Sequence, residues 1–323
     1  MSGWRNDARS GSATNIPGDP ALSSEPSADF GPVTVFFGEK TGKYPDGNQV
    51  IVNGGDMRVA FDTPCVANRI GPTFDEVDMV ILGHVHEDHM AGLHRVPHAP
   101  VHVHEDDVAA ARSWEGLAAH FGYDPASMDE FRARIEREFN YVPRPDAIAY
   151  PDGQRWDLGG GVSVEAIHMP GHTRGHCVLL VQPGGIAFIG DIDLTGFGPY
   201  YGDATSDLAA FRRSIERLPS IPAKVWITSH HRGVYTDRDR MLADLQAYGS
   251  KLDAREEKIL GLLAEAPRRL DELIGLGLVY PAEYASPNVS AIESRTVSQH
   301  LDELLADGRI ARRDDGAWRL AGR

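Results

Sequence analysis

The chain has 323 residues, of which 41% are hydrophobic and 24% charged, so it can build a substantial core and about two domains. Its formal net charge of −15 disfavours general nucleic-acid binding, which needs a basic surface, and docking on anionic membranes. No apolar run reaches the ~18 residues of a transmembrane helix. Two cysteines, Cys65 and Cys177, make no disulfide framework, and we expect reduced thiols in a cytoplasmic protein.

The first 30 residues are rich in Ser, Gly, Pro, Asp and Ala and lack the basic start and apolar segment of a secretory signal. This composition predicts a disordered or extended tail over residues 1–30. The alternative is a tail that lies across a partner subunit, which only Trp4 supports.

Short strands are expected next, at residues 32–37, 48–52 and 57–61. The last two are joined by Asn53-Gly-Gly-Asp56, which is a strong hairpin turn. Asp62 closes the third strand.

The most informative stretch is Gly83-His-Val-His-Glu-Asp-His-Met-Ala-Gly92, which follows an apolar run typical of a buried strand. A helix would place His84 and His86 about 200° apart around its axis. At the end of a strand they share a face, and the following turn can bring Asp88 and His89 beside them. The pattern therefore predicts metal ligands at a strand end.

Three further apolar runs also end in a residue that can bind metal. These residues are His172, which follows the run 162–167, Asp191, which follows Gly190, and His230, which follows the run 225–229. Four such endings in this order predict that one edge of a sheet gathers the ligands.

The motif set His-x-His-x-Asp-His, Gly-His, Gly-Asp and a last His resembles that of the metallo-β-lactamase superfamily, over roughly residues 31–250. The resemblance implies an α/β fold, the αββα sandwich of that superfamily, and two metal ions. At the matching positions, His84, His86 and His172 would bind one ion. Asp88, His89 and His230 would bind the second, and Asp191 would bridge the two. We expect two Zn²⁺ per chain, although Fe or Mn could substitute.

The same resemblance assigns supporting roles. Asp62 would orient the metal loop through hydrogen bonds, the alternative being an ordinary turn residue. His176 is expected to be structural rather than ligating. Asp193 could compete with Asp191, but the Gly190-Asp191 pair fits the pattern better. His231 would then lie behind a ligand or contact substrate.

Helical spacing covers residues 105–120 and 124–139, and the second of these helices is a candidate lid or dimer contact. A Gly-rich loop follows Asp191, and we expect three of its aromatic residues to contact substrate, because loops at ligand-bearing strand ends wall the pocket. They are Phe197, Tyr200 and Tyr201. An amphipathic helix is expected over 207–218 with Ser206 as its N-cap.

From residue 252 to 323 the order of expected elements is helix, helix, helix and hairpin, with helices at 255–266, 269–275 and 294–307. This order resembles a winged helix, including the tail appended to certain metallo-β-lactamase-fold hydrolases. The segment has ten basic and 13 acidic residues, whereas a DNA-reading module is normally basic. We expect a domain that packs or dimerises, so a homodimer is possible.

Taken together, the residues predict a metal-dependent hydrolase. A metal-bridging hydroxide would attack the substrate, and Asp88 would orient it and shuttle its proton. The first expectation is a small-molecule carbonyl substrate, such as a thioester, lactone, ester or amide. An endoribonuclease or phosphodiesterase, and a hydrolytic dehalogenase of an activated aryl chloride, are alternatives. A ligand-sensing transcription regulator is disfavoured by the intact ligand set.

Overall fold

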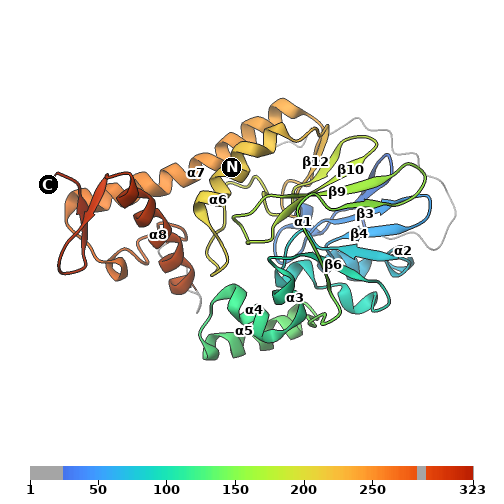
Figure 1. Cartoon of the computed structure of the whole chain (residues 1–323), viewed down its shortest axis with the longest axis horizontal. Helices are drawn as coiled ribbons and strands as arrows, with labels where there is room; N and C mark the ends of the chain where they lie inside the picture. Colours follow the sequence, from blue (N-terminus) through green and yellow to red (C-terminus); the bar gives the residue numbers. More distant parts are fainter. Residues whose placement is uncertain (1–24, 282–288, 323) are drawn as a thin grey trace, which may run out of the picture.

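The computed structural model describes residues 25–281 and 289–322, and two β-sheets form the core of its larger part, on the right in Figure 1. Among the described residues the first sheet has seven strands, which lie in sequence order, antiparallel up to the fourth and parallel thereafter. They are β1 (Ser27–Phe30), β2 (Val33–Phe36), β3 (Gln49–Asn53), β4 (Arg58–Phe61), β5 (Met79–Ile81), β6 (Val101–His104) and β7 (Ile148–Tyr150).

The second sheet, over the same described residues, has six strands in the order β13-β12-β11-β10-β9-β8. They are β8 (Arg155–Asp157), β9 (Ser163–His168), β10 (Cys177–Gln182), β11 (Ile186–Phe188), β12 (Val225–Ile227) and β13 (Val234–Tyr235). Because β9, β11 and β12 run in one direction, their carboxyl ends meet at one edge.

The faces of the two sheets pack against each other through fully buried β-branched and aromatic side chains, as alternation along half-buried strands predicts. Val35 and Phe61 of the first sheet, for example, share this core with Leu179 and Phe188 of the second.

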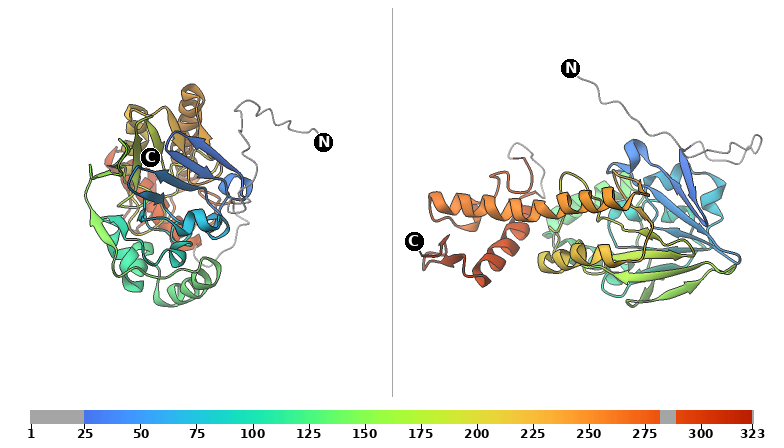
Figure 2. Two further views of the ribbon diagram at one scale, coloured as in Figure 1. Left: turned by 90° about the vertical axis from the view of Figure 1, so that its right-hand side faces the viewer. Right: turned by 90° about the horizontal axis from the view of Figure 1, so that it is seen from above.

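Helices cover both outer faces (Figures 1 and 2). Those on the first sheet are α2 (Pro72–Asp75), α3 (Val108–Arg112), α4 (Trp114–Phe121) and α5 (Pro125–Glu138), and those on the second are α6 (Leu208–Arg217) and the first half of α7 (Arg238–Glu265). The short α1 (Glu39–Gly42) lies in the loop after β2, and 3-10 turns occur at Cys65–Arg69, Glu87–His89, Leu93–Arg95 and Leu218–Ser220. The layers are therefore αββα, and the predicted fold class is confirmed.

The C-terminal part has a core of its own. The end of α7 packs there with the short turn η5 (Leu270–Glu272), with α8 (Val289–Ala306) and with the hairpin of β14 (Ile310–Arg312) and β15 (Trp318–Leu320). The hairpin and the helix before it occur in the expected order, but the helix expected over 269–275 is only the 3-10 turn η5, and the helix expected over 255–266 is the end of α7. The assignment as a winged helix stays a prediction. None of the described helices is both long and apolar enough to cross a bilayer.

Several boundaries differ from those expected. Residues 27–30, placed in the tail, form β1 and pair with β2, whereas the rest of the predicted tail up to residue 24 lies outside the described residues. The helix expected over 105–120 is broken at Ser113, whose side chain caps α4. The N-cap of α6 is Asp207 and not Ser206, because the Asp207 carboxylate accepts from the Ala210 amide.

The boundary expected at residues 250–252 lies inside α7, which runs unbroken from residue 238 to 265. The division of the chain into separate domains therefore stays a prediction, because one helix belongs to two hydrophobic cores.

The sandwich core should dominate stability. Replacing fully buried Leu179 by alanine leaves a cavity between the sheets and should cost about 2–5 kcal/mol of unfolding free energy. Urea denaturation would measure the loss. Leu305→Ala is the matched control, because this leucine is 42% exposed, and equal effects of the two substitutions would contradict the packing described.

Candidate metal centre

The predicted ligands all follow strand ends at one edge of the sandwich. His84, His86, Asp88 and His89 follow β5, and the other three follow β9, β11 and β12. The seven side chains are at least 85% buried, although they are spread over 146 residues of sequence between His84 and His230. The structure brings every predicted ligand into one cluster.

Four of them form a first group, in which the possible ligand atoms of His84, His86, His172 and Asp191 lie within 4.8 Å of one another. Nε2 of His172 is 3.4 Å from Oδ2 of Asp191, and Nε2 of His84 is 4.0 Å from the same oxygen. Nδ1 of His86 lies 3.1 Å from Nε2 of His172.

The second group consists of Asp88, His89 and His230. Nε2 of His230 is 3.1 Å from Oδ2 of Asp88, and Nε2 of His89 is 3.7 Å from it. The same two nitrogens lie 3.6 and 3.3 Å from Oδ1 of Asp191. One oxygen of Asp191 therefore faces each group, as a bridging carboxylate requires.

In the first group, outer hydrogen bonds fix which nitrogen of the His86 and His172 rings faces inward. Nδ1 of His172 donates to the Tyr200 carbonyl at 3.0 Å, and Nε2 of His86 donates to Asp203 at 2.9 Å. When both rings are neutral, each has its proton on the outer nitrogen, so two lone pairs point at each other across 3.1 Å. That arrangement is repulsive unless a proton or a cation lies between them.

The second group is built in the same way. Nδ1 of His89 donates to Asp62 at 2.7 Å, and Nδ1 of His230 donates to the carbonyls of Gly42 and Asp46 at 2.9 and 3.0 Å. Both rings then direct Nε2 toward carboxylates, as an N–H donor when the ring is protonated and as a lone pair when it is neutral. Asp62 also accepts from the Gly83 amide at 2.7 Å, so it joins the metal loop to β4, the place expected for it.

Burial and neighbouring charge move the pKa values in opposite directions across the cluster. Burial lowers the pKa of His172 to about 3 and that of His84 well below its usual range. Burial would also lower the pKa of His86, but the hydrogen bond and charge of Asp203 outweigh it and raise that pKa to about 9. Burial is likewise outweighed at His230 by Asp191 and Asp88, which raise its pKa to about 10.

These observations fit a pair of divalent cations. Both ring nitrogens of His84, Nε2 of His89 and Oδ1 of Asp191 are buried with no hydrogen-bond partner among the described residues. Buried polar atoms are normally paired, and imidazole with carboxylate is the donor set that suits zinc. The first group could hold one ion and the second another.

His176 and Asp193 are placed differently from the ligands. Nδ1 of His176 donates to the Met169 carbonyl, and Nε2 accepts from the Asp191 amide at 3.2 Å, so both nitrogens bond backbone groups and the ring joins Asp191 to the end of β9. The carboxylate of Asp193 accepts from the Thr195 amide, and burial followed by the charge of Asp191 raises its pKa to about 7.

Of the four residues expected to contact substrate, two lie next to the histidine cluster and two face other parts of the chain. The Tyr200 ring lies 5.7 Å from that of His172, and half-buried His231 lies beside His230 with a left-handed φ of 58°. Tyr201 differs from the expectation, because it is 1% exposed and its hydroxyl bonds His300 of α8. Phe197 packs against Tyr280 and not against the cluster.

Two buried carboxylates near the centre were not predicted. Asp203 holds His86, and the Tyr200 hydroxyl donates to its other oxygen at 3.0 Å. Asp107 accepts from the amides of Val85 and Gly175, so it joins the loop after β5 to the loop after β9. Both lie in loops without a recognisable motif, and only their position after a strand, or in a Gly-rich loop, could have signalled them.

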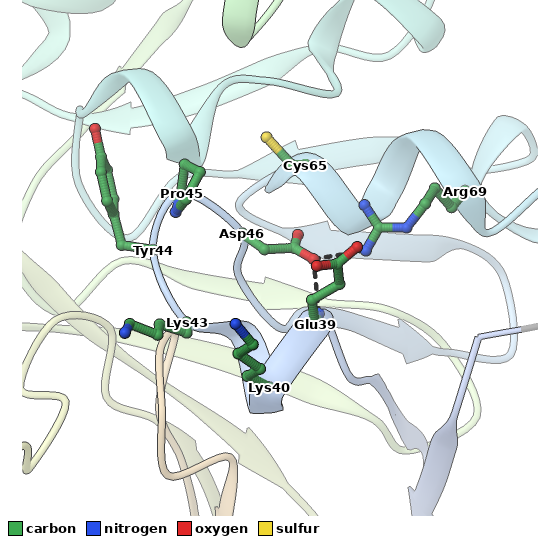
Figure 3. Close-up of a pocket in the computed structure, with 8 residues that line it drawn as sticks. All are labelled: Glu39, Lys40, Lys43, Tyr44, Pro45, Asp46, Cys65 and Arg69. Atoms are coloured by element: carbon green, nitrogen blue, oxygen red, sulfur yellow. Dashed lines mark hydrogen bonds and ion pairs between the residues drawn. The ribbon is translucent and has the colours of Figure 1, made fainter.

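A pocket of about 400 Å³ is lined by the segment 39–46 together with Cys65 and Arg69 (Figure 3). No metal-facing side chain lines it. It belongs to the segment 39–46, which reaches the centre through the Asp46 carbonyl bound to His230 and through the Tyr44 hydroxyl bound to Glu87 at 3.0 Å. Arg69, on its far wall, is paired with Asp46 at 2.6 Å.

Comparison with known proteins agrees with this geometry. The family model of the Metallo-beta-lactamase superfamily matches residues 65–230, from the segment before the first motif to the last histidine. The chain belongs to the metallo-β-lactamase superfamily. The family match covers the sandwich edge that carries the seven predicted ligands.

Relatives in this superfamily include hydrolases. The chain is 25% identical over 202 residues to an atrochrysone carboxyl ACP thioesterase of Pseudocercospora fijiensis, covering 61% of this chain and 57% of that protein. It is 21% identical over 276 residues to a beta-lactamase-like protein 2 homolog of Drosophila melanogaster, covering 81% and 83%. A hydroxyacylglutathione hydrolase of Maricaulis maris is 25% identical over 238 residues, covering 68% and 86%.

Solved structures of the metallo-β-lactamase fold extend over the C-terminal part as well. A metallo-beta-lactamase family protein from Thermus thermophilus has a TM-score of 0.64 at 21% identity, covering 90% of this chain and 98% of that one. A beta-lactamase domain protein from Burkholderia ambifaria has a TM-score of 0.65 at 19% identity, covering 94% and 97%. At these identities the likeness shows the fold alone.

Asp203→Asn tests the outer support of the first group. An amide can turn its NH₂ toward Nε2 of His86 and loses the carboxylate charge, so the affinity for added Zn²⁺ should fall about 10–100-fold. Competition with a chromophoric chelator measures it. Asp157→Asn is the control and should leave the Zn²⁺ affinity unchanged, because Asp157 is an exposed residue of β8. A Zn²⁺ affinity of Asp203→Asn equal to that of the wild type would contradict the role assigned to Asp203.

Proposed function

We propose that this chain is a hydrolase with two divalent cations, Zn²⁺ first, that acts on a small-molecule carbonyl compound. The observation that carries the proposal is the sharing of Asp191 between two groups of inward-facing imidazoles. The names of its relatives, which include a thioesterase and hydroxyacylglutathione hydrolases, favour a thioester among carbonyl compounds.

The chemistry divides between the ions and the chain. When bound, the cations would supply Lewis acidity, which lowers the pKa of water and polarises a carbonyl oxygen. Asp88 would orient the water and carry its proton, because its Oδ2 lies between His230 and His89. Asp62 and Asp203 would keep their histidines in the tautomer that leaves the inner nitrogen free.

The 400 Å³ pocket is the proposed place for the part of the substrate that is not hydrolysed. Its mouth carries Lys40 and Lys43, whose ammonium groups have no ion pair with another described residue (Figure 3). Lys40 is held at a left-handed φ of 53°, a strained conformation that is common in ligand-binding loops. Two free cations in an acidic chain favour a substrate with an anionic group.

A substrate panel tests the reaction class. Zinc-loaded protein should hydrolyse a thioester faster than a phosphodiester or an activated aryl chloride, and chelation should abolish the activity until zinc is restored. His86→Ala should lower kcat/KM by at least about 100-fold, since it removes a ligand and the partner of Asp203.

His94→Ala is the matched control, because this exposed histidine follows the same motif but bonds only the Ala91 carbonyl. Hydrolysis that survives chelation and His86→Ala would remove the proposal. Faster turnover of bis(p-nitrophenyl) phosphate than of every thioester would replace the carbonyl substrate by a phosphodiester.

Substitution of both lysines tests the pocket. Lys40→Gln with Lys43→Gln should raise the KM for S-lactoylglutathione, which has two carboxylates, about tenfold and leave kcat unchanged, because ion pairs to substrate would be lost without change at the metals. The KM for a neutral N-acetylcysteamine thioester should not move. An equal rise in KM for both thioesters would show that the lysines do not bind the carboxylates of the substrate.

A further inference from the structure

The segment from Ile192 to Ser206 connects the shared carboxylate Asp191 to α6, and it has no helix or strand of its own. Such a segment must satisfy its backbone carbonyls by other means. On one side it contacts the first group of metal-facing histidines, and on the other it contacts the C-terminal helices.

The contacts toward the centre reach both His86 and His172. The Tyr200 carbonyl accepts from Nδ1 of His172 at 3.0 Å, and the Asp203 carboxylate accepts from Nε2 of His86 at 2.9 Å. The Ser206 hydroxyl donates to the His172 carbonyl at 2.7 Å. The segment therefore fixes the orientation of two rings in the first group.

The contacts away from the centre begin with Arg255 of α7. Its guanidinium donates to the carbonyl of Pro199 at 2.6 Å, to that of Phe197 at 3.0 Å and to the Tyr201 hydroxyl at 3.1 Å. Arg255 is only 6% exposed and lies in the buried stripe of the helix, between Leu252 and Ile259, where apolar residues are the rule.

Helix α8 adds three more contacts to the same segment. Arg295 donates to the Gly202 carbonyl at 2.6 Å, and Gln299 donates to the Tyr201 carbonyl at 3.1 Å. The Tyr201 hydroxyl lies 2.8 Å from Nε2 of His300. Four carbonyls of the segment, at residues 197, 199, 201 and 202, thus accept from side chains of α7 and α8.

Burying a guanidinium is costly unless its donors are paired, and apolar side chains would pack two helices on a loop at lower cost. The several N–H donors of a guanidinium can fix the positions of individual carbonyls, whereas an apolar contact cannot. The neighbouring carbonyl of Tyr200 is the one that holds His172.

We propose that Arg255, Arg295 and Gln299 are positioning residues of the metal centre, so that the C-terminal helices set the affinity of the first metal site. The inference rests on the metal centre of the proposed function. It assigns to the C-terminal part a role in zinc binding at a site whose ligands all come from the sandwich.

The effect should be confined to one site. The rings of the second group are held by Asp62 and by the carbonyls of Gly42 and Asp46, and none of these comes from the 192–206 segment. Loss of the C-terminal contacts should therefore weaken one zinc-binding step and spare the other.

The experiment compares stepwise zinc binding of full-length variants by competition with a chromophoric chelator. Arg255→Met keeps the length of the side chain and removes its donors, and it should weaken one step by at least about tenfold, as loss of outer-shell support does. Arg255→Lys, which retains a single donor group, should recover part of the affinity. His86→Ala identifies the affected step, and adding Arg255→Met to it should change the remaining step by less than about twofold.

Arg212→Met is the matched control. Arg212 of α6 forms ion pairs with Asp253, Glu256 and Glu303 of the C-terminal helices, but none of these contacts reaches the 192–206 segment. This variant should lower the unfolding midpoint while both zinc affinities stay unchanged. Gln299→Leu is a second test on α8 if Arg255→Met does not fold, and it too should weaken one step.

Wild-type affinities in Arg255→Met and Gln299→Leu would overturn the inference and leave the proposed function intact. Equal weakening of both steps would also overturn it, because that is the result of a loosened fold. A wild-type chain that binds no zinc would remove the proposed function and the inference together.

Discussion

Four buried imidazoles each donate a hydrogen bond to an outer partner and direct the other ring nitrogen inward, and the surrounding structure keeps those partners in place. His86 and His172 face each other across 3.1 Å, while His89 and His230 face the carboxylates of Asp88 and Asp191. The hydrogen bond and charge of Asp203 raise the pKa of His86 to about 9 against the effect of burial, so this outer partner also favours the protonated ring. Metal binding and proton release are coupled in such a site.

The outer partners explain why the centre lies where it does. They come from four places: the carbonyls of the loop before β3, Asp62 after β4, the Tyr200 carbonyl and Asp203. Strands that run in one direction end at one edge, so the sandwich brings these segments together although they are far apart in sequence. The buried core between the sheets then holds these segments with little freedom, which a precise arrangement of metal-ligating side chains needs.

The sequence predicted those structural features that depend on the residues of one short segment. Three features could be predicted because each depends on local spacing or on a pattern specific for one fold. They are the gathering of the side chains from His84 to His89, the turn at Asn53-Gly-Gly-Asp56 and the sandwich fold. Asp203 could not be predicted, since its pairing with His86 spans 117 residues and no pattern surrounds it. Tyr201 was expected to contact substrate because an aromatic residue in a glycine-rich loop looks the same whether it faces a pocket or, as here, a helix.

Helix α7 is continuous and packs in two hydrophobic cores, so it connects the C-terminal part to the region around the metal-facing histidines. Leu252 belongs to the core under the second sheet and Ile259 to the C-terminal core, and these two residues are two turns apart on one face of the helix. Arg255 lies between them on the same buried stripe. A helix held in both cores cannot rotate about its axis or slide without moving this guanidinium relative to the carbonyls of Phe197 and Pro199. A displacement of the C-terminal core would therefore act on the segment that orients His86 and His172.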